Sequence, residues 1–287
     1  MNIKEALLFV YGIIFATSTP YLKPKKRFLF PTATYRFDSD KYNSSLTFFL
    51  GGSGICAHLR SKAGEISKTF LVNANLGVAA DQWRSDMGSV GGFKNATLAL
   101  SSVNGIFGNA DIIASLGSVD KVYVHAERTE ELEGFTSLPL ENISRETVLQ
   151  AGDETIRLIP VDGCATESDL VVFFEKRSVM MFGSLFVNRI HPQLKSGVSP
   201  RTPKWIATLE HLIARYSPVV CVPGEGDIGT VEDVQEFIRY LKSLTDPSKD
   251  FSFCRKNFDW MEIPSATSLE ENFDTLRLNV KTHTSIN

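Results

Sequence analysis

The chain repeats one organisation twice: short β-type segments followed by helical segments. In the first half, apolar or alternating strand patterns separated by glycine-containing turns occur at residues 45–50, 55–60 and 69–72. In the second half, strand patterns occur at residues 155–161, 170–174 and 179–182. Neither half can cover both faces of its own sheet, so the two halves are expected to pack sheet on sheet with helices outside. The pattern therefore predicts a four-layer αβ/βα sandwich with two facing mixed β-sheets.

Two helices are predicted in the second half, on either side of a buried strand at residues 218–222. Thr202 as N-cap and Pro203 at the first helical position open one helix. Its apolar stripe is Ile206, Leu209, Leu212, Ile213 and Tyr216. Thr230 with Asp233 opens the other. Its stripe is Val234, Phe237, Ile238, Leu241 and Leu244. The second half thus contains enough amphipathic helix to cover one sheet.

Size and charge limit the organisation and the partners. With 287 residues, of which 43% are hydrophobic, the chain can bury a sizeable core, and we expect one domain at residues 45–287. The formal net charge of -3 comes from 30 basic and 33 acidic residues. No basic field of the kind that binds nucleic acid is visible, so we expect no nucleic-acid partner.

The N-terminal residues 1–18 read as a signal peptide or a membrane anchor. An apolar run at residues 6–16 ends in small residues, with Ala-x-Ser at Ala16 and Ser18. A basic cluster follows within residues 19–44, which we expect to form an irregular leader, and this flank favours an anchor. Three interpretations stay open: export with cleavage, a membrane tether through residues 6–18, or a plain hydrophobic N-terminus. Export is favoured, which predicts a secreted protein.

Glycosylation and cysteine patterns add weak support for export. Sequons occur at Asn43, Asn95 and Asn142, and they would accept glycans in a eukaryotic secretory pathway. The four cysteines show no CxxC spacing and leave room for one disulfide: Cys56, Cys164, Cys221 and Cys254. Cys221 lies in the buried strand pattern and is expected to be a core residue.

Four loop sequences follow one another in a recognisable order: SSVNGIFGN (101–109), ATESDL (165–170), FGSL (182–185) and PGEG (223–226). They resemble the HxHxDH, HTxGD, GD and PGHG turns of the metallo-β-lactamase superfamily. FLVNAN (70–75) looks like the family's LIDTG strand with Asn73 in place of the aspartate, and LRLNV (276–280) is similar to the closing helix of some members. The resemblance covers residues 45–244 and implies the same αβ/βα sandwich.

The resemblance places the family's zinc ligands on residues of other types. The positions are Leu100, Ser102, Asn104, Gly105, Ala165, Ser184 and Glu225, and none carries the usual histidine or aspartate. Zinc is held by imidazole, thiolate or carboxylate, with about three protein ligands at a catalytic site. Only Glu225 offers such a group. The resemblance therefore implies a vestigial pocket with no zinc and no other cofactor.

The remaining candidates for chemistry are weak. Cys164 lies on the loop facing the former metal pocket, but no activating group is evident, so a structural role is favoured. Glu225 could act as an acid or base, alone or with Asp162. His191 is the histidine that could reach the mouth of the cleft and hold a displaced metal. His125, at the end of a strand, is expected to be a capped or half-exposed histidine rather than a metal ligand.

The sequence therefore predicts a catalytically degenerate protein that uses the vestigial pocket to bind a small molecule or a protein partner. The alternative is a hydrolase of esters, lactones or thioesters, acting with an atypical metal site or without zinc. Gly183, Gly224 and Gly226 are expected to meet backbone requirements, through positive φ or close chain approach.

Overall fold

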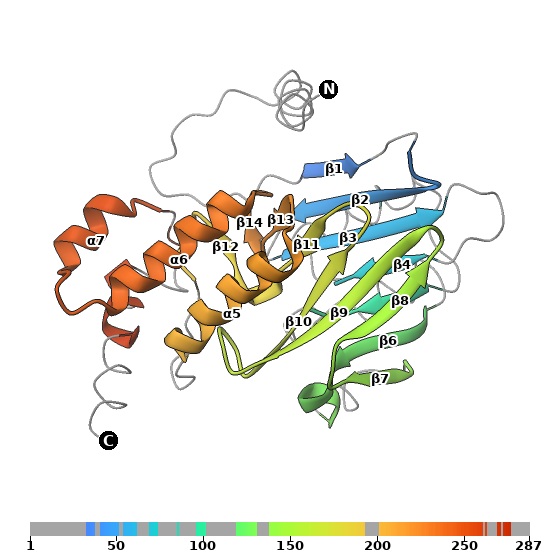
Figure 1. Ribbon diagram of the computed structural model, residues 1–287, viewed down its shortest axis with the longest axis horizontal. Coiled ribbons are helices and arrows are strands. Elements are labelled where there is room, and N and C mark those ends of the chain that lie inside the picture. The colour runs from blue at the N-terminus through green and yellow to red at the C-terminus, as the bar shows by residue number, and fades with distance from the viewer. Residues whose placement is uncertain are drawn as a thin grey trace.

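Two β-sheets face each other across an apolar core in the computed structural model of the protein (Figure 1). The structure describes residues 33–37, 41–51, 54–61, 69–73, 85, 96–101, 119–130, 138–192, 201–260, 262, 269–270 and 272–276. The predicted sandwich arrangement of the two sheets is confirmed.

The first sheet has seven strands in chain order. They are β1 (Ala33–Phe37), β2 (Ser44–Gly51), β3 (Gly54–Ser61), β4 (Phe70–Val72), β5 (Ala96–Ala99), β6 (Val119–His125) and β7 (Leu140–Ile143). Strands β1 to β4 are antiparallel to their neighbours, whereas β4 to β7 run parallel. This sheet is therefore mixed, as predicted.

The second sheet has five strands in the order β13-β11-β10-β9-β8. They are β8 (Thr147–Ala151), β9 (Glu154–Asp162), β10 (Ser168–Phe174), β11 (Val179–Met181) and β13 (Val220–Val222). Strands β11 and β13 are parallel and the other pairs are antiparallel. A short parallel pair, β12 (Val187–Asn188) with β14 (Glu225–Gly226), lies beyond the ends of β11 and β13.

Strand β10 shows why the second sheet is buried on both faces. Leu170, Val172 and Phe174 point into the core between the sheets. The alternate residues Val171 and Phe173 point into a second core beneath the helices. Because side chains alternate along a strand, a continuous apolar run signals burial on both faces.

Helices α5 (Thr202–Tyr216) and α6 (Val231–Thr245) lie side by side over the outer face of the second sheet, followed by α7 (Phe251–Asn257) (Figure 1). The capping box of Thr230 and Asp233 at the start of α6 is confirmed. The start of α5 differs by one residue, because Arg201 is the N-cap and Thr202 already belongs to the helix. None of the helices within the described segments has the length and hydrophobicity needed to span a membrane.

The N-terminal part of the chain enters the sheet earlier than the sequence indicated. Residues 1–18, including the candidate tether at 6–18, lie outside the described residues. Within residues 19–44, interpreted as an irregular leader, β1 pairs antiparallel with β2 along its whole length. This strand is short and half-exposed, so its hydrophobic pattern is weak, and only its partner in the sheet reveals it.

All four cysteines are buried and none of them forms a disulfide, although the sequence left room for one. Cys221 lies in β13 with its side chain in the helix-side core, which confirms its predicted core role.

A buried ion pair ties the two sheets together at the start of β2. The guanidinium of Arg177, in the turn between β10 and β11, donates to the carboxylate of Glu154. It also donates to the carbonyl oxygen of Ser44 at 2.6 Å. Both members of the pair are buried in the second sheet, and the bond from Arg177 to Ser44 joins this sheet to β2 of the first sheet.

Candidate functional site

The carboxyl ends of strands from both sheets meet at one edge of the sandwich. In the first sheet β4, β5 and β6 run parallel and end together. In the second sheet β9, β11 and β13 share one direction, since β10 is antiparallel to both β9 and β11. The backbone N–H of Leu170 donates to the carbonyl oxygen of Ser101 at 3.0 Å, which joins the two sheets at this edge. Loops following strand ends are a common location for binding and catalytic groups.

Asn73 fixes the start of the loop that follows β5. Its side-chain oxygen accepts the backbone N–H of Ser101 at 2.8 Å, and its amide donates to the Ser101 hydroxyl at 2.8 Å. Asn73 has a φ of 58°, a left-handed conformation that asparagine adopts more readily than most residues. The Asn73 side chain therefore joins the end of β4 to the residues that follow β5 by hydrogen bonds.

Three glycines allow the strand ends to approach one another. Gly183 has a φ of +57°, and a Cβ on it would lie 2.9 Å from the Ser101 hydroxyl. A Cβ on Gly224 would lie 2.6 Å from the carbonyl oxygen of Gly183. Gly226 has a φ of +100°, with the carbonyl oxygen of Asn188 2.4 Å from the position of a Cβ. The expectation that these glycines meet backbone requirements is confirmed.

Four of the seven positions implied by the resemblance lie in the described residues. Leu100, directly after β5, is buried, and its N–H donates to the carbonyl oxygen of Tyr123 at 3.0 Å. Ala165, in the loop between β9 and β10, is partly buried and packs against the helix-side core. Ser184 follows β11, and Glu225 opens β14. Ser102, Asn104 and Gly105 lie outside the described residues.

Two carboxyl groups near these positions are shielded from water. Burial raises the pKa of the Glu225 carboxyl to about 7, and no cation of the described segments forms an ion pair with it. Burial also raises the pKa of Asp169, at the start of β10, to about 6, although Thr166 and Ser184 favour its charged form. Ser184 lies near Asp169, whose carboxyl oxygens have no hydrogen-bond partner of good geometry among the described residues. Glu225 is the acidic side chain at the four described ligand positions.

Several solved metallo-β-lactamases share this arrangement. One from Pontibacter korlensis superposes with a TM-score of 0.55 at 13% identity, covering 74% of this chain and 99% of that one. The IND-7 metallo-β-lactamase gives 0.54 at 16% identity, with 73% and 98% covered. The DIM-1 metallo-β-lactamase gives 0.52 at 15% identity, with 74% and 99% covered. No protein-family model and no curated protein sequence matches the chain.

The chain has the metallo-β-lactamase fold. The four-layer αβ/βα architecture expected from the ordered loop motifs is therefore correct. At 13 to 16% identity the likeness to these structures concerns the fold, and it assigns no activity to this chain.

His191 is not accessible from the surface, so the prediction that it could reach the mouth of the cleft is wrong. It is buried in the helix-side core, where Nδ1 lies 3.0 Å from the Tyr240 hydroxyl and the ring lies beside Trp260. Burial lowers the pKa of His191 to about 4. The chain turns inward after β12 through Arg189, whose φ is 55°. His191 is therefore a neutral core residue.

Cys164 lies in the loop between β9 and β10, and its environment does not favour a nucleophilic thiolate. The thiol is buried, and Sγ lies 3.4 Å from the Thr208 hydroxyl and 3.6 Å from the carbonyl oxygen of Asp162. Burial raises the pKa of this thiol, so the reactive thiolate is disfavoured.

Two of the three sequons are accessible. Asn43 and Asn142 are exposed, and Asn142 accepts a hydrogen bond from the Thr129 hydroxyl. Asn95 lies outside the described residues. An exposed side chain is what attachment of a glycan requires.

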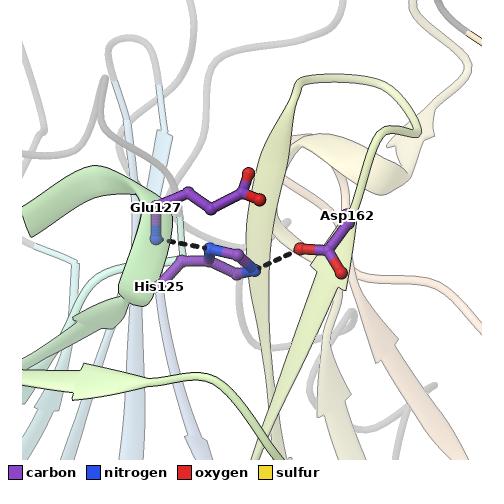
Figure 2. A group of neighbouring side chains, drawn as sticks. All are labelled: His125, Glu127 and Asp162. Carbon is purple, nitrogen blue, oxygen red and sulfur yellow. Dashed lines mark hydrogen bonds and ion pairs between the residues drawn. The ribbon is translucent and has the colours of Figure 1, made fainter.

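A group that the sequence did not bring together lies at the same edge. His125 ends β6, Glu127 is in the short 3₁₀ helix η3 (Ala126–Arg128), and Asp162 ends β9 in the other sheet (Figure 2). His125 Nδ1 accepts the backbone N–H of Glu127 at 3.2 Å, so the side chain is hydrogen-bonded and caps η3, and it is buried rather than half-exposed. Its Nε2 lies 2.8 Å from Oδ1 of Asp162. The sequence signal for the pairing of His125 with Asp162 is weak: each residue is the last one of a strand, and these strand ends lie at the same edge of the sandwich.

Proposed function

We propose that this chain is a catalytically degenerate protein of the metallo-β-lactamase fold. It uses the edge where the carboxyl ends of the strands meet to bind a ligand and does not hydrolyse it. One observation carries the proposal: the side chains at the described zinc-ligand positions. Leu100 and Ala165 have no donor atom, and Ser184 is a neutral hydroxyl beside Asp169. A catalytic zinc site needs about three histidine, cysteine or carboxylate ligands, and Glu225 alone does not supply them.

The same residues favour a small neutral ligand over an anionic one. Glu225 is half-buried, and burial raises its pKa to about 7, so near neutral pH it is partly protonated and can donate or accept a hydrogen bond. Ala165, in the loop between β9 and β10, is a partly buried apolar residue. Small-molecule sites commonly combine apolar walls with a few polar groups. The alternative ligand is a protein partner that inserts a small neutral side chain at this edge.

A second candidate function is hydrolysis of an ester, lactone or thioester with an atypical metal or without zinc. The observation that favours it is again Glu225, since a carboxyl group with a pKa near 7 can act as a general acid or base at neutral pH. This role would require Glu225 to lie beside the reacting group of a substrate.

Ligand-observed NMR with a mixture of neutral and anionic fragments tests the binding proposal. The wild-type protein should bind neutral fragments in preference to carboxylates, and Ala165→Trp should abolish that binding because the indole fills the edge. Val148→Trp adds the same ring on exposed surface of β8 and should bind as the wild type does. Fragment binding that survives in Ala165→Trp would place the ligand elsewhere and overturn the proposal.

A further inference from the structure

We propose that His125, Glu127 and Asp162 bind one divalent transition-metal ion. One ligand atom from each residue lies within 4.8 Å of the others, and the three side chains converge from two different sheets (Figure 2). These residues are not among the positions where the family resemblance places zinc. The inference concerns metal binding and does not depend on the proposed ligand-binding function.

Two of these atoms are close enough to become neighbouring ligands of one ion. Ligand atoms about 2.1 Å from a tetrahedral zinc ion are about 3.4 Å apart. His125 Nε2 and Asp162 Oδ1 are 2.8 Å apart. They can therefore serve as neighbouring ligands if the two side chains separate by about 0.6 Å and the Glu127 N–H leaves the ring.

The orientation of the imidazole is an independent indication. His125 is only 5% exposed, yet its Nε2 has no hydrogen-bond partner of acceptable geometry among the described residues. The contact with Asp162 is thus close but is not aligned with the ring N–H direction. A buried polar atom without a partner calls for an explanation such as a missing water or ion.

Charge and exposure also suit a cation. The Asp162 side chain is 61% exposed and Glu127 is exposed, so an ion can reach the group from solvent. Arg128 follows Glu127 in the chain, but its Nε donates to the Ser168 hydroxyl at 2.6 Å. The carboxylates of Glu127 and Asp162 repel each other, and a divalent cation between them relieves that repulsion.

Binding requires the ring proton of His125 to move. The hydrogen bond from the Glu127 N–H to Nδ1 places the proton of the neutral ring on Nε2. A metal on Nε2 needs the other tautomer, in which solvent has carried this proton to Nδ1. The backbone N–H of Glu127 must then leave the ring, so metal binding and the cap of η3 are mutually exclusive. The amide of Glu127 therefore reports directly on the bound state.

The donor set selects the class of ion. One imidazole with two carboxylates suits zinc and its first-row neighbours better than magnesium or calcium, which prefer oxygen ligands alone. Among the common divalent ions Zn²⁺ binds such mixed sites more tightly than Mn²⁺ or Fe²⁺. With three protein ligands the remaining coordination positions fall to water.

Calorimetric titration of the full chain with ZnCl₂ tests the proposal. The wild-type protein should take up about one equivalent, and Asp162→Asn, which keeps the size of the side chain, should lower the affinity at least tenfold. His125→Gln should lower it further. Asp120→Asn changes an exposed carboxylate on β6, the strand that ends at His125, and should bind zinc with the affinity of the wild type.

Amide NMR spectra separate this group from any other zinc site. The Glu127 amide resonance should shift on zinc addition in the wild type and not in Asp162→Asn. Absence of zinc uptake by the wild type overturns the proposal. Uptake that Asp162→Asn leaves unchanged also overturns it, because the ion then binds elsewhere.

Discussion

Replacing Gly226 with alanine should destabilise the protein by about 2 to 4 kcal/mol. Gly226 has a φ of +100°, which an L side chain adopts at a cost of about 1 to 3 kcal/mol. In addition, the new Cβ would lie 2.4 Å from the carbonyl oxygen of Asn188. That carbonyl belongs to β12, which pairs with β14, so the contact is relieved only by moving backbone. We assign about 1 kcal/mol to this displacement, the scale of one weakened hydrogen bond.

Two matched variants separate the strain from the clash. Gly163 also has a positive φ, +56°, but the nearest atom to its Cβ position is Arg201 Nη1 at 3.6 Å, on a flexible side chain. Gly163→Ala should therefore cost only the backbone strain, about 1 to 2 kcal/mol. Gly224→Ala has the opposite combination, since its Cβ would lie 2.6 Å from the Gly183 carbonyl oxygen without a positive φ. Gly224→Ala should therefore also reduce the free energy of unfolding by less than Gly226→Ala does.

Urea unfolding followed by far-UV circular dichroism measures the three free energies of unfolding. If the reasoning holds, the midpoints fall in all variants while the denaturant slope stays unchanged, since the surface exposed on unfolding is the same. The claim that close backbone contact at Gly226 adds to the cost of its positive φ is refuted if Gly163→Ala is as destabilising as Gly226→Ala. It is also refuted if Gly226→Ala changes the free energy of unfolding by less than about 0.5 kcal/mol, the range of an ordinary surface substitution.

Three further predictions concern charge and export. Arg177→Met should cost about 3 to 5 kcal/mol in urea unfolding because it leaves Glu154 buried without its partner, and adding Glu154→Leu should recover part of that loss. Burial raises the pKa of Glu225 to about 7 from its ordinary 4.5, so the folded state favours the protonated carboxyl. Its stabilising effect is complete below about pH 4.5 and is lost as pH rises through 7, so wild type should lose stability relative to Glu225→Gln between about pH 5 and 8; a constant difference contradicts this. Expressed in a eukaryotic secretory host, the protein should reach the medium with a new N-terminus after Ser18 and lose mass in Asn142→Gln; an intact N-terminus in mass spectrometry would refute cleavage.

The sequence predicted the fold because its strongest signals are local. The stripes of α5 and α6, the Thr230 capping box and the continuous apolar run of β10 each depend on residues close in the chain. The order of the loop motifs then identified the sandwich. Strand β1 was missed because five residues with mixed exposure carry little periodic signal, and its stability comes from pairing with β2.

The candidate site was only partly predictable. Glycines at tight approaches could be recognised, because only a few backbone arrangements require glycine. His191 was misplaced because sequence distance from β12 does not reveal the inward turn at Arg189. The pairing of His125 with Asp162 joins two sheets, and neither residue has a local pattern that points to the other.

The most direct test of the binding account is the rate at which the zinc-supplemented protein hydrolyses a simple aryl ester, a lactone and a β-lactam. We expect rates equal to those of buffer with the same zinc concentration, because the described ligand positions provide one carboxylate, Glu225, and no histidine. Glu225→Gln and His125→Gln serve as matched controls and should give the same rates. Turnover that rises with protein concentration would contradict the binding proposal and support the hydrolase alternative, and its loss in one of the two variants would identify the group responsible.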